Sequence, residues 1–300
     1  MVKKSDLGKP KHPKGKKTLL HLKDDGLAST IAPSLAGLVS EGLQTTSKND
    51  QFREINHPEI KKILVYPDAQ KAAFAAAHFI ADCVLNNPQA AISYATGNSK
   101  VLVYQKVAQL ITEGKVDFSQ TKAFHLDEYY PCDPKADHSF VAYLNRLVFG
   151  PFRIKPENAY PMNGLAPDPD REAARYDRLL KKNPVDLVIL GIGPKGHIAF
   201  NESGTLFNRR THVIRLAPET IRRDRWERGQ DSPHHAITQG VKNILEAEKI
   251  LMIAYGSVYN SRLKLALKGP IGVACSASAL REQGQKTTFI IDEAAAQGLG

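Results

Sequence analysis

Short aliphatic runs alternate with helix-like segments along most of this chain, and this alternation restricts the fold more than any other feature. The strongest run is VDLVILGIG at 185–193, an aliphatic stretch suited to a strand that is buried on both faces. Similar runs lie at 61–66, 90–95, 121–126, 211–216, 249–256 and 287–292. Helical patterns lie between them, at 68–87, 99–114, 138–148, 168–182 and 257–269. The alternation predicts an α/β fold with a doubly wound, mainly parallel, Rossmann-like sheet.

The net charge of +10 is concentrated at the N-terminus. Residues 1–23 carry eight lysines against one aspartate, a balance of +7. A stretch so rich in Lys, Pro and Gly cannot nucleate a core, so we expect residues 1–50 to be a basic, disordered tail and lead-in, and 51–300 to be a single domain. Such a tail can touch nucleic acid or an anionic surface. No aromatic residues interleave with the lysines, which favours a solvated arm without a specific partner.

Cysteine use and hydropathy exclude several classes of protein. The sequence has no run of 18 apolar residues, so no membrane-spanning helix is predicted. Cys83, Cys132 and Cys275 are far apart and form no CxxC pair, which argues against a zinc knuckle or a disulfide framework. The simplest interpretation is a protein of the reducing cytoplasm.

Polar clusters follow three of the predicted strands, and ligands bind at this end of such sheets. The first is ATGNS at 95–99, which joins a strand to a helix. Its hydroxyls and backbone N–H groups at a helix N-terminus suit a phosphate, although short loops with glycine are common in any α/β fold. The candidate phosphate-binding residues are Thr96, Gly97, Asn98 and Ser99.

The second cluster, FHLDEYY at 124–130, places Asp127 and Glu128 directly after a strand. Adjacent residues rarely point the same way, so we expect one carboxylate to face the cleft and the other the framework. A carboxylate in a cleft can move a proton between neighbouring carbons of a substrate. An N-cap and a solvated acid remain the alternative for this pair.

The third cluster is LGIGPKGHIAFNESG at 190–204. Its glycines, Gly193 and Gly196 among them, allow the backbone to turn tightly and to approach a ligand. Glu202 lies five residues after His197 and can fix its tautomer, which suits a general acid or base. The glycine spacing fits GxGxxG on paper, but no acidic residue about twenty positions later supports a dinucleotide site.

These three motifs, with HAITQGVKNILEAEKILMIAYGS at 235–257, resemble the glucosamine-6-phosphate deaminase family over roughly residues 55–292. That family shares a fold group with 6-phosphogluconolactonases, ribose-5-phosphate isomerases and CoA transferases. The resemblance implies an enzyme that opens the ring of an amino-sugar phosphate and moves a proton between C2 and C1. Ammonia then leaves to give a ketose phosphate, without a metal or a redox cofactor.

The resemblance also implies roles for particular residues. Asp127 would be the proton shuttle, and His197, supported by Glu202, would assist ring opening. The loop 96–99 would hold the phosphate, with help from an arginine of ETIRRDRWE. Arg225 is favoured there, while Arg222 and Arg223 compete with it. The candidate binding set also includes Glu128, Gly193 and Gly196.

Three residues depart from the family pattern. Lys195 stands where the family has an aspartate before the glycine and histidine, and Tyr259 stands where it has a phosphate-binding lysine. Lys100 replaces the family's usual proline and could supply the missing cation. If Lys195 shares the cleft with His197, it should disfavour the imidazolium form and lower deamination.

A sugar-phosphate isomerase or deaminase is therefore the leading hypothesis, with a small-molecule sugar phosphate as its ligand. One alternative is a binding protein that holds sugar phosphates without turnover, and a second is a hydrolase similar to 6-phosphogluconolactonase. Release of ammonia would distinguish a deaminase from both alternatives. The sequence leaves open the identity of the sugar and the formation of a homo-oligomer.

Overall fold

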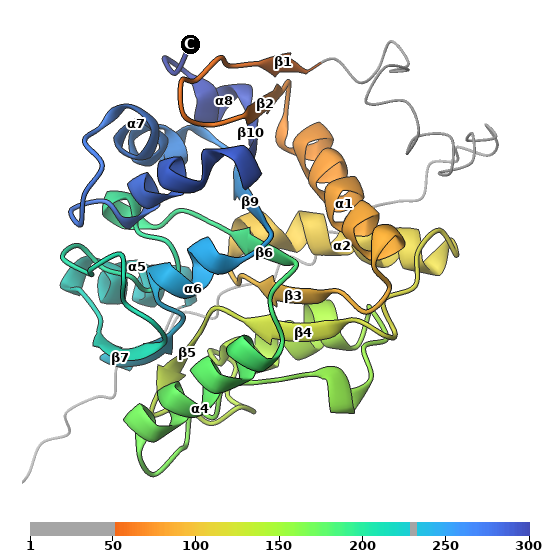
Figure 1. Cartoon of the computed structure of the whole chain (residues 1–300), viewed down its shortest axis with the longest axis vertical. Coiled ribbons are helices and arrows are strands. Elements are labelled where there is room, and N and C mark those ends of the chain that lie inside the picture. The colour runs from red at the N-terminus through yellow and green to blue at the C-terminus, as the bar shows by residue number, and fades with distance from the viewer. Residues whose placement is uncertain (1–51, 229–232) are drawn as a thin grey trace, which may run out of the picture. The chain divides into compact units, whose positions relative to one another are not determined.

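The computed structural model describes residues 52–228 and 233–300, and its centre is a seven-stranded sheet (Figure 1). The strand order is β1-β2-β10-β9-β6-β3-β4, and all neighbours run parallel except β1 and β2. The strands are β1 Arg53–Glu54, β2 Lys62–Tyr66, β3 Ala91–Tyr94, β4 Lys122–His125, β6 Leu187–Leu190, β9 Lys249–Ala254 and β10 Thr287–Asp292. The predicted doubly wound, mainly parallel fold is confirmed. The predicted N-terminal tail lies outside the described residues.

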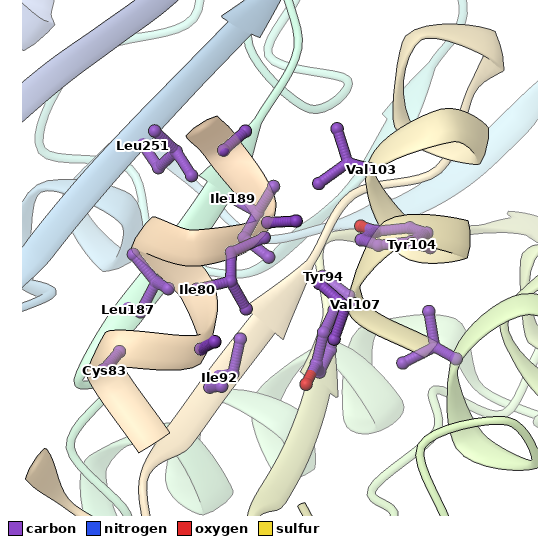
Figure 2. Packing of buried hydrophobic residues seen from close by; sticks show 14 of the residues in the cluster. Ile80, Cys83, Ile92, Tyr94, Val103, Tyr104, Val107, Leu187, Ile189 and Leu251 are labelled. Carbon is purple, nitrogen blue, oxygen red and sulfur yellow. The ribbon is translucent and has the colours of Figure 1, made fainter. Parts of the chain in front are cut away.

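Helices cover both faces of the sheet because successive strand residues point to opposite sides. Leu64 and Ile189 pack under α1 (Ala69–Asn86) and α2 (Asn98–Thr112), as Figure 2 shows for Ile189 and its neighbours. Val65 and Leu190 belong to the second core, with residues of α6 (Val241–Glu246), α7 (Asn260–Lys268) and α8 (Glu293–Ala296). Both faces of the strands are therefore buried, as their near-continuous aliphatic character requires.

A smaller antiparallel sheet lies beside the main one. It consists of β5 (Asp127–Tyr130), β8 (His235–Thr238) and β7 (His212–Arg215), in that order. The predicted strand 211–216 therefore exists but joins this second sheet and not the parallel one. Leu126 alone separates β4 from β5, so the chain passes from one sheet to the other at that residue.

The remaining helices connect these sheets. They are α3 Phe140–Leu144, continued by a π-helical turn at Asn145–Phe149, α4 Pro169–Lys182 and α5 Pro218–Arg228. Short 3₁₀ segments lie at Pro156–Asn158, Pro194–Gly196, Ser257–Tyr259 and Ser276–Lys286. Across the described ranges, every helix is too short or too polar to cross a bilayer.

Candidate active site

A cavity lies at the carboxyl ends of β9, β6, β3 and β4, four neighbouring strands of the parallel sheet. Ligand sites of doubly wound sheets form at this edge, where the loops after adjacent strands meet. The walls come from all three polar clusters of the sequence and from α5 and α7. The lining residues that carry polar side chains are Thr96, Asn98, Ser99, Lys100, Asp127, His197, Arg223, Tyr259 and Arg262.

The loop after β3 presents the start of α2 to the cavity. Gly97 is the N-cap, with φ of +106°, and no side chain caps the helix. A positive φ is a conformation that glycine adopts without strain. The first turn of a helix carries N–H groups without intrahelical partners and a partial positive charge, so this wall suits an anion. The structure thus brings all four residues predicted to bind phosphate, 96–99, to the cavity wall.

The adjacent carboxylates Asp127 and Glu128 take different positions, because β5 directs successive side chains to opposite sides. Asp127 lines the cavity and is 7% exposed. Glu128 points into the framework, where its carboxylate accepts hydrogen bonds from Ser139 Oγ, Phe140 N and Val141 N at 2.8–3.0 Å. Glu128 therefore holds the start of α3 and does not line the cavity, although it belonged to the predicted binding set.

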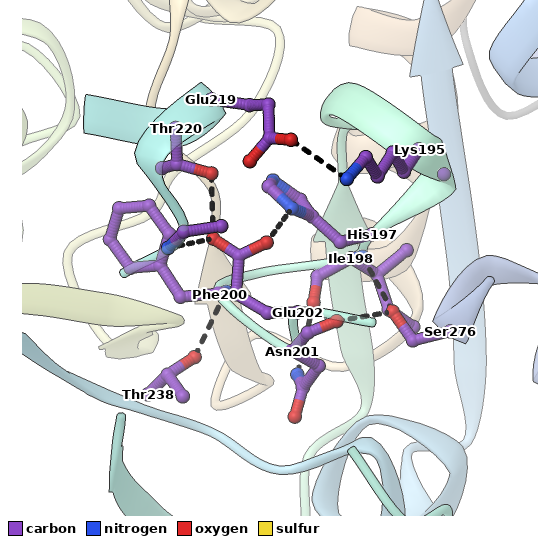
Figure 3. A network of polar contacts seen from close by, with 12 residues as sticks. Lys195, His197, Ile198, Phe200, Asn201, Glu202, Glu219, Thr220, Thr238 and Ser276 are labelled. Atoms are coloured by element: carbon purple, nitrogen blue, oxygen red, sulfur yellow. Dashed lines mark hydrogen bonds and ion pairs between the residues drawn. The ribbon is translucent and has the colours of Figure 1, made fainter. Parts of the chain in front are cut away.

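His197 lies against the cavity with its ring held by Glu202 (Figure 3). Its Nδ1 is 3.0 Å from Glu202 Oε2, and the other carboxylate oxygen accepts a 2.6 Å hydrogen bond from Thr220 Oγ1. Burial raises the pKa of Glu202, but the hydrogen bonds from His197 and Thr220 outweigh it and hold that pKa below its ordinary value. An ionised carboxylate only accepts hydrogen bonds, so Nδ1 carries the proton and Nε2 is left as a proton acceptor.

Two glycines of this loop lie where no larger side chain fits. A Cβ on Gly193 would lie 1.8 Å from His197 Nε2, so only glycine fits beside the ring. Gly196 has φ of +78°, and a Cβ there would approach Cys275 Sγ to within 2.4 Å. Gly193 lines the cavity, whereas Gly196 is buried behind it. These glycines thus shape the loop that carries His197.

Lys195 forms an ion pair with a residue of α5 and does not line the cavity. Its Nζ makes a 2.8 Å ion pair with Glu219 in the first turn of α5, and its side chain is 63% exposed (Figure 3). Lys195 is not among the lining residues. Its backbone has φ of 55°, in the left-handed region that non-glycine residues rarely adopt. The sequence left open whether Lys195 shares the cleft with His197; the structure pairs Lys195 with Glu219 and leaves it outside the set of residues that line the cavity.

The arginine that reaches the cavity from α5 is Arg223, one of the two alternatives considered. Arg225, the favoured candidate, is exposed and borders a separate hollow with Arg222 and His234. Residues two positions apart on a helix are about 200° apart around its axis, so the two arginines cannot share a wall. The orientation of α5 decides between them.

Arg262, on α7, also lines the cavity, and sequence reasoning did not single it out. Its Nη1 donates a 3.1 Å hydrogen bond to the carbonyl of Ile192, and its guanidinium lies 4.9 Å from the ring centroid of Tyr259. Both residues follow β9: Tyr259 ends the 3₁₀ turn before α7, at the position that departs from the family pattern, and Arg262 lies in the first turn of α7. The available signal in the sequence was an arginine three residues after position 259, where the chain departs from the family pattern.

Comparisons with known proteins identify the family of this chain. The model of the family described as glucosamine-6-phosphate isomerases/6-phosphogluconolactonase matches residues 67–289. The chain belongs to this family. Glucosamine-6-phosphate deaminase 1 of Giardia intestinalis is 37% identical over 214 residues, which cover 70% of this chain and 80% of the relative. A glucosamine-6-phosphate deaminase of Bacillus pumilus is 35% identical over 236 residues, or 78% of this chain and 98% of the relative.

Solved structures agree with this membership of the glucosamine-6-phosphate isomerase/6-phosphogluconolactonase family. A monomeric glucosamine-6-phosphate deaminase superposes with a TM-score of 0.76 at 30% identity, over 78% of this chain and 98% of that one. The 6-phosphogluconolactonase of Trypanosoma cruzi gives 0.64 at 17% identity, over 82% of this chain and 99% of that one. The lactonase likeness shows the shared fold alone.

Proposed function

We propose that this chain is a hexosamine-6-phosphate deaminase, which converts an aldosamine 6-phosphate and water into a ketose 6-phosphate and ammonia. The observation that carries the proposal is the shared cavity: Asp127 and His197, which Glu202 holds, line the same cavity as the start of α2. A phosphate on that wall would place a sugar chain against both groups. The curated relatives named glucosamine-6-phosphate deaminases support the same substrate class.

The first step is ring opening. His197 Nε2 takes the proton of the C1 hydroxyl, the bond from C1 to the ring oxygen breaks, and the imidazolium gives its proton to the released oxygen. The negative charge of Glu202 stabilises the imidazolium that forms and keeps its Nδ1 proton in place. The product is an open-chain aldehyde with its amine on C2.

The second step is proton transfer by Asp127. The carboxylate removes the proton from C2 while the C1 oxygen gains a proton from solvent, which gives an enolamine. Asp127 then returns the proton to C1, which leaves an iminium at C2. Water adds to this carbon and ammonia departs, so a ketone remains. A single carboxylate serves both transfers because C1 and C2 are neighbours.

The decisive experiment offers the protein glucosamine 6-phosphate, glucosamine and 6-phosphogluconolactone. We expect release of ammonia and formation of fructose 6-phosphate from the first compound alone. Ammonia and ketose phosphate are each measured with a coupled dehydrogenase assay. Binding of glucosamine 6-phosphate without ammonia would favour the non-catalytic alternative, and faster opening of the lactone than its spontaneous rate would favour the hydrolase.

Glu202→Gln tests the partner of the histidine. The amide keeps the size of the side chain but removes the charge that stabilises the imidazolium, so we expect kcat for ammonia release to fall about tenfold or more, with little change in KM. The matched control is Glu219→Gln, because that carboxylate contacts Lys195 and not the histidine. Equal losses of kcat in the two variants would contradict the role of Glu202.

Lys195→Met tests whether this lysine acts through α5. Glu219, its partner, lies one helical turn before Arg223, so the ion pair steadies the helix that carries a cavity arginine. An exposed pair contributes at most about 1 kcal/mol, so we expect KM for the phosphorylated substrate to rise about two- to fivefold at nearly unchanged kcat. A large fall or rise of kcat, measured by the same ammonia assay, would instead place Lys195 in the chemistry.

A further inference from the structure

Lys100 is a buried lysine of the cavity wall that the proposed mechanism does not use. It is the third residue of α2 and is 3% exposed. Its Nζ donates a 2.7 Å hydrogen bond to Ser99 Oγ, which leaves two of its three protons without this partner. Within the described part of the chain, it makes no ion pair with a carboxylate. A buried ammonium that has only a neighbouring hydroxyl as its partner lacks the anion it needs.

The position of Lys100 opposes its charge in two ways. Burial removes the ammonium from water, and this desolvation lowers the pKa of Lys100 to about 7. The first turn of a helix is also the positive end of its dipole, which disfavours a cation. Both costs would be offset by an anion bound at the same helix end. A phosphate bound at this wall would therefore be attracted both by the helix end and by the Lys100 ammonium.

The loop after β6 makes room for this ammonium. Gly191 faces Lys100, and a Cβ at position 191 would lie 2.0 Å from its Nζ. The lysine tip therefore occupies the gap between the start of α2 and the end of β6, at the cavity wall. The other ionisable groups that face the cavity are Asp127, His197, Tyr259, Arg223 and Arg262. When His197 is neutral, the cavity is lined by three basic side chains and one carboxylate, which favours an anionic ligand.

We propose that Lys100 binds the phosphate of the substrate directly, and that it takes up a proton when the phosphate enters. This inference rests on the proposed function, since it assigns a residue to the phosphate of the same substrate. A sugar phosphate is mostly a dianion at pH 8, because its second ionisation lies near pH 6. The incoming dianion favours the charged form of the lysine, so binding draws a proton from the solvent. Lys100 would then supply a cation that position 259 does not.

The test measures affinity and proton uptake by titration calorimetry. The probe is 2-amino-2-deoxyglucitol 6-phosphate, which lacks a carbonyl at C1 and cannot isomerise. Titrations at pH 8 in two buffers with different ionisation enthalpies give the number of protons taken up. The variants are Lys100→Met, which keeps the length without the charge, and Lys106→Met, a control on the same helix that borders another hollow. Unphosphorylated 2-amino-2-deoxyglucitol shows how much of the affinity depends on the phosphate.

We expect the wild-type protein and Lys106→Met to bind alike and to take up close to one proton more than Lys100→Met. We expect Lys100→Met to bind at least tenfold more weakly, since charge-assisted hydrogen bonds to phosphate are among the strong ones. Unchanged affinity and proton uptake in Lys100→Met, while the wild type still releases ammonia, would overturn the role of Lys100 alone. No binding of the phosphorylated probe by any variant, together with no ammonia release, would overturn the proposed function as well.

Gly191→Ala gives an independent route to the same answer. The new methyl group would displace the flexible tip of Lys100 while the amine itself is kept. We expect it to weaken binding of the probe about as much as Lys100→Met does. Added to Lys100→Met, it should cost little more, because the displaced ammonium is already absent. Additive losses in the double variant would show that the two residues act separately and would contradict the inference.

Discussion

Asp127→Asn is expected to lower kcat for ammonia release by about 10²–10⁴-fold, which is the contribution that a placed proton-transfer group typically makes. The amide keeps the shape of the side chain and removes the basic oxygen that takes the C2 proton. Because this role belongs to the transition state, KM should change much less than kcat. The measurement is steady-state release of ammonia from glucosamine 6-phosphate, with the melting temperature recorded beside it.

The adjacent residue is the matched control. Glu128 is as buried as Asp127 but holds the start of α3 through Ser139, Phe140 and Val141. Glu128→Gln should destabilise the fold by about 1–3 kcal/mol, since it weakens hydrogen bonds to a buried charge. The folded fraction should retain most of its kcat. Near-normal turnover in Asp127→Asn, or equal losses of kcat in the two variants, would refute the assignment of the proton shuttle.

Lys100→Met is expected to make the ligand-free protein more stable, although it weakens phosphate binding. The ordinary pKa of a lysine, 10.5, applies in the unfolded chain, whereas the folded value is about 7. At 1.36 kcal/mol for each pKa unit, the buried ammonium costs up to about 5 kcal/mol of folding free energy. A methionine of similar length avoids this cost. Lys100 would thus lower the stability of the ligand-free protein and raise its affinity for the phosphate.

The pH dependence gives the sign of this effect. Between about pH 7 and 10.5 the unfolded chain holds a proton on Lys100 that the folded protein lacks, so native stability rises with pH. As pH falls through this window the stability is lost, and below about pH 7 the full cost is present. The free-energy gap between Lys100→Met and the wild type should therefore be about 3 kcal/mol wider near pH 6.5 than near pH 9.5.

Denaturant unfolding of both proteins at the two pH values measures this gap. Other titrating groups are shared by the two proteins and cancel in the difference. Lys106→Met should show no comparable widening, because Lys106 is only half-buried and its hollow lies elsewhere. If the gap stays constant with pH, the Lys100 ammonium is solvated in the folded protein. The desolvation on which the predicted proton uptake depends would then be absent.

The sequence alone was sufficient for the fold class and for the loops of the site. Buried parallel strands must be almost entirely apolar, so their runs stand out from the helices between them. Polar residues directly after such runs then mark the edge where ligands bind, and this placed 96–99, Asp127 and His197 on one cavity. The contact between His197 and Glu202 was also predictable, because it is local to one loop.

Tertiary structure decided what depends on orientation and on distant partners. The orientation of α5 selects Arg223 over Arg225, and Lys195 pairs with Glu219, which lies 24 residues away in sequence. Arg262 is held at the cavity by a hydrogen bond to the carbonyl of Ile192, which lies 70 residues away in sequence. The side chain of Lys100 enters the wall because Gly191, on another strand end, leaves space for it. Periodicity in a sequence shows which residues share an element, but the packing of elements against one another determines which residues face the same cavity.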